Sequence, residues 1–203
     1  MVENTKGDSA NPLGLYTWLP FGPFDTAEAF ITQFFNVCTK PNKSDTLFAI
    51  YNKNPDSTEE MAGLYRYVFS SDIDLSTEIG PAITFPRFQG THVTSNTISL
   101  LLHYALDLPL KGLGLRRVQW ETNIHNAVSR RVAEKMGFVK ESIMRWRHVL
   151  SPAKAIIATN RQEIRKGDPR EGCAGRDTVM FALCWDDWES GGREHADAVM
   201  QRK

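Results

Sequence analysis

Two helices predicted from the sequence begin with residue types that could bind a ligand. The stretch "FPRFQGTHVTSNTISLLL" (85–102) reads as the end of a strand, a turn containing Gly90, and the start of a helix. Such a junction directs backbone N–H groups and the positive helix end at one point, and phosphate groups bind well there. Many strand–helix junctions share this pattern, so a turn without a ligand is the alternative interpretation.

The second of these helices, predicted over "NAVSRRVAEKM" (126–136), begins with an amide and a hydroxyl, although its other polar residues are charged. Asn126, Ser129 and Ala133 share one stripe at helical spacing. If this stripe faces the first junction across a cleft, its side chains could hydrogen-bond to a linear ligand such as pantetheine. The alternative is that Asn126 caps the helix and Ser129 is solvated. The opposite, buried stripe is predicted to comprise Val128, Val132 and Met136.

Other chemical motifs are weaker. The five histidines do not form a metal-ligand pair such as HExxH, so no metal site is predicted. The stretch "GLGLRR" (112–117) lacks the third glycine of a dinucleotide fingerprint and precedes a strand instead of following one, which favours a turn. The sequence contains neither a GxSxG elbow nor a Walker loop. The histidines are His92, His103, His125, His148 and His195.

Composition limits the class of protein. The 203 residues include 41% hydrophobic residues, which suits one packed domain, and 24 basic residues balance 24 acidic ones. This neutrality argues against a nucleic-acid partner. The three cysteines, Cys38, Cys173 and Cys184, are expected to be free thiols of a reducing compartment. With no long apolar run and a polar start, the sequence predicts a soluble, cytoplasmic protein without a membrane partner.

The elements that must position these residues form a mixed α/β (α+β) pattern. Strands are predicted at 46–52, 61–70, 76–85, 115–123, 142–150 and 177–185, and helices at 25–37, 94–108 and 126–136. The first two strands should form a hairpin, and Thr94 or Ser95 should cap the second helix. The fold class is therefore a central mixed, mostly antiparallel sheet flanked by helices. The expected organisation is a polar lead over 1–14, one domain over 15–190, and a tail over 191–203 that could contain a short helix.

Two irregular segments are expected to shape the surroundings of a site. The aromatic stretch "LYTWLPFGPF" (15–24) is typical of a buried loop or a pocket wall. A polar insertion over 151–176 separates the last two strands. Loops of this kind often build the binding surface on a common scaffold, so both are expected to line the cleft that binds a substrate.

The stretch "RVQWETNIHNAVSRRVAEKMGFVKES" (117–142) carries a resemblance to a known family. It resembles the "RV…NxxS…EKxGFxxEG" segment of the GNAT N-acetyltransferases, most of all the branch that acetylates the N-termini of ribosomal proteins. The preceding "EIG…QGTHVTSNTISLLLHYAL" and the later "DTVMFALCWDDW" are similar to the same branch, so the match covers 62–188. The stretches "LPFGPF" and "CWDDWE" extend the similarity to fungal members.

This resemblance implies a GNAT fold that uses acetyl-CoA as a co-substrate. It implies that the turn holds the pyrophosphate, that Asn126 and Ser129 contact the pantetheine or adenylate arm, and that the end of the third strand lines the thioester. The residues of the turn are Gln89, Gly90, Thr91, His92, Val93 and Thr94, and those beside the thioester are Ile83, Thr84 and Phe85.

The sequence departs from the family pattern at three positions. His92 and Thr94 stand where the family's turn has small residues, and Ala133 stands where many members carry a tyrosine that acts as a general acid. These departures keep a second hypothesis open, in which the chain is a CoA-binding module without catalytic activity. A third hypothesis is an interaction domain that uses an arginine-rich surface, comprising Arg145, Arg147, Arg161, Arg165 and Arg170.

The leading hypothesis is acetyl transfer from acetyl-CoA to a primary amine, either a protein N-terminus or a small molecule, by direct attack on the thioester. An amine is mostly protonated at neutral pH, so a base is expected. Glu78, on the strand that leads into the turn, is the first candidate, and Glu121 on the neighbouring strand is the second. For both, the alternative is an exposed strand residue. The protein is expected to act as a monomer or homodimer.

Overall fold

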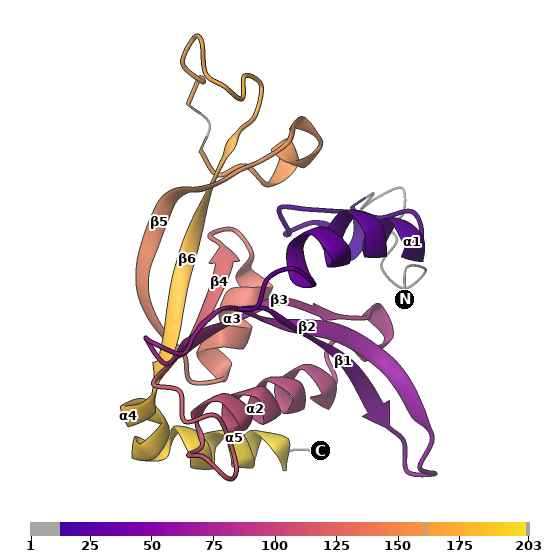
Figure 1. Ribbon diagram of the computed structural model, residues 1–203, viewed down its shortest axis with the longest axis vertical. Helices are drawn as coiled ribbons and strands as arrows, with labels where there is room; N and C mark the ends of the chain where they lie inside the picture. Colours follow the sequence, from indigo (N-terminus) through magenta and orange to yellow (C-terminus); the bar gives the residue numbers. More distant parts are fainter. Residues whose placement is uncertain (1–12, 161, 202–203) are drawn as a thin grey trace.

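The computed structural model describes residues 13–160 and 162–201, so most of the polar lead expected over 1–14 lies outside the described residues. Within them, six strands form one sheet in the order β1-β2-β3-β4-β6-β5 (Figure 1). The pairing of β3 with β4 is parallel and the other pairings are antiparallel, which confirms the predicted fold class. The strands are β1 (Thr46–Lys53), β2 (Glu59–Ser71), β3 (Ser76–Thr84), β4 (Arg117–Asn123), β5 (Val139–Val149) and β6 (Gly175–Cys184).

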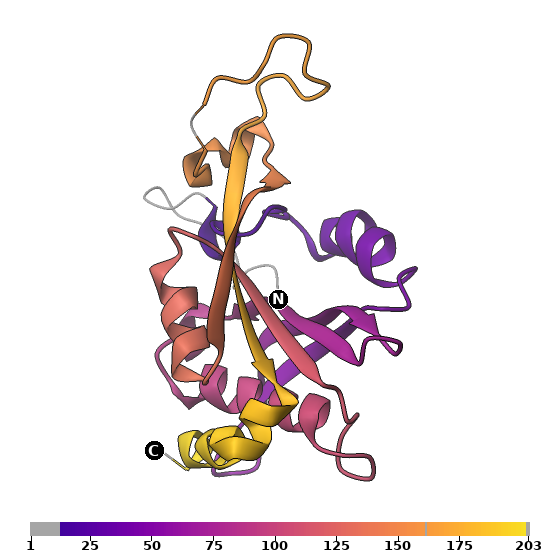
Figure 2. The same ribbon diagram turned by 90° about the vertical axis from the view of Figure 1, so that its left-hand side faces the viewer.

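Helices cover both sides of this sheet. In Figures 1 and 2, α2 and α5 lie together on one side of β1–β3, and α1 lies on the other. The segment between β5 and β6 extends away from the rest of the chain in both views. The α-helices are α1 (Ala27–Phe30), α2 (His92–Leu106), α3 (Ala127–Lys135), α4 (Trp185–Asp187) and α5 (Arg193–Met200). Wider π-type turns span Ile31–Thr39 and Trp188–Gly192, and 3-10 turns span Gly14–Tyr16, Pro86–Phe88 and Pro152–Ile157. None of the helices in the described part of the chain has the length and apolarity needed to cross a membrane.

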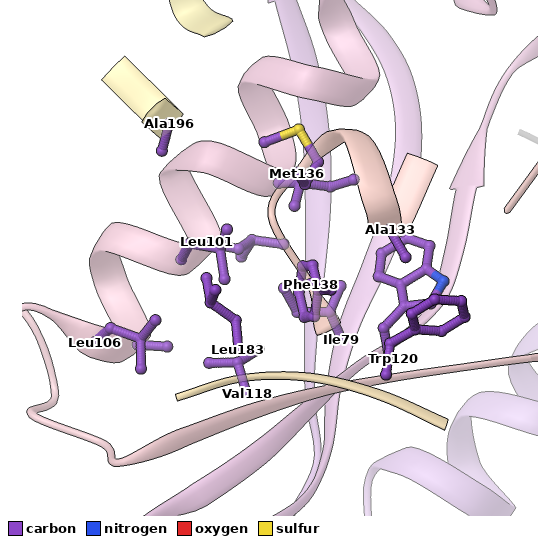
Figure 3. Close-up of a cluster of buried hydrophobic side chains, with 14 of the residues drawn as sticks. Ile79, Leu101, Leu106, Val118, Trp120, Ala133, Met136, Phe138, Leu183 and Ala196 are labelled. Carbon is purple, nitrogen blue, oxygen red and sulfur yellow. The ribbon is translucent and has the colours of Figure 1, made fainter. Parts of the chain in front are cut away.

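The main hydrophobic core lies between the sheet and α2, α3 and α5 (Figure 3). The i, i+3, i+4, i+7 spacing of Ile98, Leu101, Leu102 and Ala105 predicts one apolar face of α2, and the burial of all four confirms it. The helix starts earlier than predicted. Thr91 is its N-cap, instead of Thr94 or Ser95, because the Thr91 hydroxyl accepts a hydrogen bond from the backbone N–H of Val93.

One face of β4 and the C-terminal helix α5 also contribute to this core. Strand alternation predicts that Val118, Trp120 and Thr122 of β4 share one face, and each of them is at most 5% exposed. Residues after position 190 form α5, which packs against α2 and buries Ala196 and Val199 in the same cluster. The division into a lead over 1–14, a domain over 15–190 and a tail over 191–203 remains a prediction from the sequence.

A second cluster joins the N-terminal segment to β2 and β3. Tyr16, Phe24, Phe30 and Phe34 are buried there, with the rings of Tyr16 and Phe24 edge to face at 5.4 Å. Such aromatic pairs add to the stabilisation from buried area. The near-helical spacing of Ala29, Phe30, Phe34 and Val37 predicts that Val37 shares this face, but Val37 is 63% exposed. The reason is that the chain winds as a wider π-type turn over Ile31–Thr39, which shifts the residues that return to one face.

The parallel strands β3 and β4 stay paired over three residue pairs only. Ser76 to Glu78 pair with Arg117 to Gln119, and the strands then separate. At the same point the pairing of β2 with β3 changes register, because Tyr65 faces Ala82 whereas Tyr67 faces Ile79. This is a β-bulge at Gly80–Pro81, where Pro81 has no backbone N–H to donate to an adjacent strand. The sequence predicted one uninterrupted strand over 76–85, so the bulge is a correction.

Candidate active site

The separation of β3 and β4 opens a cleft of about 920 Å³. Its walls come from the two parted strands, the start of α2, one face of α3 and the N-terminal segment. The structure therefore brings most of the predicted site residues to one place. They are Glu78, Ile83, Thr84, Gln89, Gly90, Thr91, Thr94, Glu121, Asn126 and Ser129.

Three predicted residues do not line this cleft. Phe85 and Val93 are 2% and 4% exposed and belong to the N-terminal aromatic cluster. His92 is exposed at the first turn of α2. Phe85 follows Thr84 in an extended chain, so its side chain points to the opposite side from the cleft wall that Thr84 forms. On α2, the side chain of Val93 points in a different direction from those of Thr94 and Ser95, which line the cleft.

Side chains hold the turn before α2 and leave its backbone facing the cleft. The Gln89 side-chain amide donates to the carbonyl of Thr84 at 3.0 Å, and the Thr91 hydroxyl donates to that of Phe88 at 2.7 Å. Gly90 has a φ of +74°, and a Cβ built on it would meet nothing within 4 Å. Open space beside a glycine at a helix start fits close approach of a phosphate to the backbone.

A buried chain of hydroxyls ties α2 to β3 beside this turn. The Tyr65 hydroxyl lies 2.7 Å from that of Thr84, which lies 2.9 Å from that of Thr94. Thr94 therefore directs its hydroxyl to the strand, and His92 is exposed. The two bulky residues that depart from the family's turn thus leave the space beside Gly90 open.

The start of α3 confirms the capping interpretation of Asn126. Its side-chain oxygen accepts from the backbone N–H of Ser129 at 3.1 Å, and the Ser129 hydroxyl accepts from the Trp120 indole at 3.0 Å. Both residues nevertheless line the cleft. Asn126 can therefore cap the helix and line the cleft at the same time. Its side-chain oxygen makes the cap, and its amide nitrogen could donate to a ligand in the cleft.

The predicted stripes of α3 need correction. Ala133, expected beside Asn126 on the polar stripe, is fully buried next to Trp120 (Figure 3). Val128, expected to be buried, is 66% exposed, whereas Met136 is buried as predicted. The helix is turned so that Ala133 and Met136 face the core together, three positions apart, and Val128 lies beyond that face.

Sequence reasoning missed a lysine at the far end of α3. The Lys135 ammonium donates to the Ser95 hydroxyl at 2.9 Å, which links the end of α3 to the first turn of α2. Both residues line the cleft. A cation beside a helix N-terminus strengthens the case for an anion there. The only signal in the sequence was a basic residue within "EKMGF". Helical spacing did not indicate that its partner would be Ser95 on another helix.

Glu78 is a buried carboxyl at the point where the strands part. It is 8% exposed, and burial together with the charge of Glu121 raises its pKa to about 8, against the opposing effect of Arg147 and Arg176. The side chain of Glu121 is also only 7% exposed, and both of its oxygens accept from Arg147, at 3.1 to 3.3 Å. Neither glutamate is the exposed strand residue of the alternative interpretation.

The N-terminal segment forms the outer wall of the cleft, as predicted. Leu15, Trp18, Leu19 and Phe21 line it. Two buried cations hold the segment in place. Lys154 donates to the carbonyl of Tyr16 at 2.5 Å, and Arg176 donates to that of Trp18 at 3.3 Å. Of the described residues in the insertion expected to shape the cleft, only the last, Arg176, lines it.

The three cysteines are free thiols. Cys184 lies with Asp186 and Asp187 in a group whose ligand-type atoms are within 4.8 Å of one another. A local explanation accounts for this grouping, since the carboxylate of Asp187 accepts from the backbone N–H of Cys184 at 3.1 Å as part of a helix cap. Exposed acidic groups of this kind are common at helix starts.

Comparison with known proteins places the chain in a family. The model of the acetyltransferase (GNAT) domain matches residues 10–139. A GCN5-related N-acetyltransferase from Brucella melitensis superposes with a TM-score of 0.74 at 23% identity, covering 98% of this chain and 75% of the other. A spermidine N-acetyltransferase from Vibrio cholerae, solved with CoA and spermine, gives 0.60 at 14% identity, covering 86% and 85%. No curated protein sequence matches the chain. The family match confirms the interpretation of the sequence: this chain belongs to the GNAT acetyltransferases.

Proposed function

We propose that this protein transfers the acetyl group of acetyl-CoA to a primary amine in the cleft between β3 and β4. One observation carries the proposal. The cleft joins a helix-start turn suited to phosphate with a buried carboxyl, Glu78, whose pKa of about 8 suits a base near neutral pH. The closer similarity to the ribosomal-protein branch and to fungal members stays a prediction from the sequence.

The residues that line the cleft fit acetyl-CoA. Backbone N–H groups at the turn around Gly90 and the first turn of α2 would bind the pyrophosphate, with the Lys135 ammonium beside them. Asn126 offers its amide to the pantetheine arm from the opposite wall. Ile83 and Thr84, on the strand that leads to the turn, would lie along the acetyl end. Bound acetyl-CoA supplies the thioester to which the amine adds directly.

Glu78 would take a proton from the ammonium form of the acceptor, directly or through one water. The freed amine nitrogen forms the new bond to the acetyl carbon as the carbon–sulfur bond breaks. Its remaining excess proton leaves with the sulfur as a thiol, and Glu78 returns its own proton to solvent. A thiolate with a pKa near ~8.5 is a good leaving group, so no strong general acid is required and Ala133 is compatible with turnover.

Two alternatives are weighed against this proposal. A CoA-binding module without catalytic activity is favoured by the lack of a tyrosine at position 133, but it gives no reason for a buried carboxyl at the strand separation. An interaction surface made of arginines is not supported. Arg147 lies in the cleft paired with Glu121, Arg165 is a solvated side chain beside Asp168, and Arg161 lies outside the described residues.

Acetyl-CoA binding should raise the melting temperature. A ligand at a hundred times its dissociation constant stabilises by ~2.7 kcal/mol, which for a domain of this size corresponds to a shift of roughly 5–10 °C. Differential scanning fluorimetry with acetyl-CoA, and with acetate or adenosine as controls, measures it. Equal melting temperatures with and without millimolar acetyl-CoA would refute the proposal.

Substitutions at Asn126 separate its two roles. Asn126→Ala removes both the cap and the amide donor, and should cost about 1 kcal/mol of unfolding free energy and about 1 kcal/mol of acetyl-CoA affinity. Asn126→Asp keeps a good cap and removes the donor, so it should keep the stability and still bind acetyl-CoA more weakly. Calorimetry and urea unfolding measure the two quantities. Wild-type affinity in Asn126→Asp would show that the residue is only a cap.

The Glu78 carboxyl should govern the pH dependence. Its ionised form is the base and is populated above its pKa, so kcat/KM should rise with pH through about 8. Glu78→Gln should lower turnover by roughly 10²–10⁴-fold and remove that midpoint, and the loss should shrink at high pH where the amine deprotonates unaided. Turnover within a few-fold of wild type from pH 6 to 9 would eliminate Glu78 as the base.

Glu121→Gln is the matched control for this experiment. The charge of Glu121 contributes to the raised pKa of Glu78, so its removal should move the midpoint of the pH profile to lower pH and leave a base in place. Loss of the midpoint in Glu121→Gln, with a normal profile in Glu78→Gln, would assign the base to Glu121 instead.

A further inference from the structure

Aromatic side chains form part of the cleft wall. Trp18, Phe21, Phe34 and Phe69 line it, and Arg176, at the start of β6, lies among the lining residues as well. Arg176 is 4% exposed. A guanidinium at this depth normally has a carboxylate partner, because burying an unpaired charge is costly.

Arg176 lacks such a partner among the residues that the structure describes. Its Nη1 donates to the carbonyl of Trp18 at 3.3 Å, and its Nε has no hydrogen-bond acceptor. Burial lowers its pKa to about 10, and Glu78 and Glu121 act on it only as charges at a distance. A pKa of about 10 still leaves the guanidinium charged at neutral pH.

The other titratable side chains that line the cleft near Arg176 are paired or neutral, and the buried Lys154, outside the lining, adds a second cation without an ion-pair partner among the described residues. Arg66 is paired with Asp45, and Arg147 with Glu121. Glu78, with its pKa raised to about 8, is mostly neutral at pH 7. His148 faces Arg176 across the β5–β6 ladder, and burial together with Arg176 and Arg147 lowers its pKa to about 4, so it is neutral too. The positive charge of Arg176 is therefore left without a compensating negative charge.

We propose that the amine acceptor is a small zwitterionic molecule whose carboxylate binds Arg176 and whose apolar body contacts the aromatic wall, as in an apolar α-amino acid. The inference rests on the proposed function, since it names the acceptor of that same cleft. The Nε atom is covered, so a carboxylate would accept from the terminal nitrogens of the guanidinium, in the charge-assisted hydrogen bonds that arginine forms with carboxylates. The amine of the same molecule then lies on the side of Glu78.

The same charges disfavour a polyamine. A polyamine brings several positive charges and a flexible apolar chain without an anion, and it would meet a region with a surplus cation. The expected acceptor therefore differs from spermine, with which the Vibrio cholerae spermidine N-acetyltransferase was solved. An unmodified peptide N-terminus has an amide in place of the nearby carboxylate and would leave Arg176 unpaired.

The test compares L-phenylalanine with phenethylamine, two amines that differ by one carboxylate. Binding to the full-length protein is measured by calorimetry with saturating CoA, and acetylation is followed by thiol release from acetyl-CoA. Phenylalanine should bind, and react in kcat/KM, about 10-fold better or more, because hydrogen bonds to a charged group exceed neutral ones. Spermidine and a peptide with aspartate as first residue are the further arms of the panel.

Variants assign the preference to one side chain. Arg176→Gln should reduce the preference for phenylalanine to within about twofold to threefold, and Arg176→Lys should restore part of it by returning the charge. Arg165→Gln, a solvated arginine of the insertion, is the control and should keep the full preference. Melting curves check that each variant is folded.

The outcomes separate this inference from the proposed function. Acetylation of phenethylamine and phenylalanine at equal rates, or a preference for spermidine or for the aspartyl peptide, overturns the inference and leaves the proposed function standing. A binding preference for phenylalanine that Arg176→Gln abolishes, without acetylation of any amine, supports the carboxylate site at Arg176 and overturns the proposed function, and with it the assignment of the zwitterion as an acceptor. If the protein shows no binding preference and acetylates none of the amines, both are overturned.

Discussion

The separation of β3 and β4 after Glu78 is the constraint on which the rest of the site depends. Two parallel strands that stayed paired would fill their shared edge with ladder hydrogen bonds and leave no room between them. The bulge at Gly80–Pro81 changes the register of β3 against β2 at the point where the ladder to β4 ends. The chain thereby gains a cleft inside a continuous sheet, with the start of α2 and the N-terminal segment among its walls.

This geometry also accounts for the chemistry of the charged groups. Glu78 lies at the last paired position, and its pKa rises because burial removes water from its charged form and because Glu121 is a like charge nearby. Glu121 lies on β4 just beyond the residues that pair with β3, and both of its carboxylate oxygens accept from Arg147 on β5. Two glutamates on adjacent strands thus have different environments, which favours different roles for them.

The sequence predicted the individual helices and strands better than the pairing and contacts between them. Local patterns predicted the apolar face of α2 and the alternation of β4, because burial follows the period of each element. The bulge was missed although "GP" stood within the predicted strand, because a proline marks a break without showing whether pairing resumes beyond it. The pairing of Glu121 with Arg147 and the isolation of Arg176 depend on the register of distant strands, which no local pattern contains.

A crystal structure of the protein with acetyl-CoA tests the central claim most directly, because the account assigns each part of the ligand to its own wall. It predicts the pyrophosphate against the backbone N–H groups of the turn at Gly90 and the first turn of α2, and the acetyl group between the parted strands beside Glu78. A pyrophosphate bound away from the start of α2, or an acetyl group outside the space between β3 and β4, would contradict it.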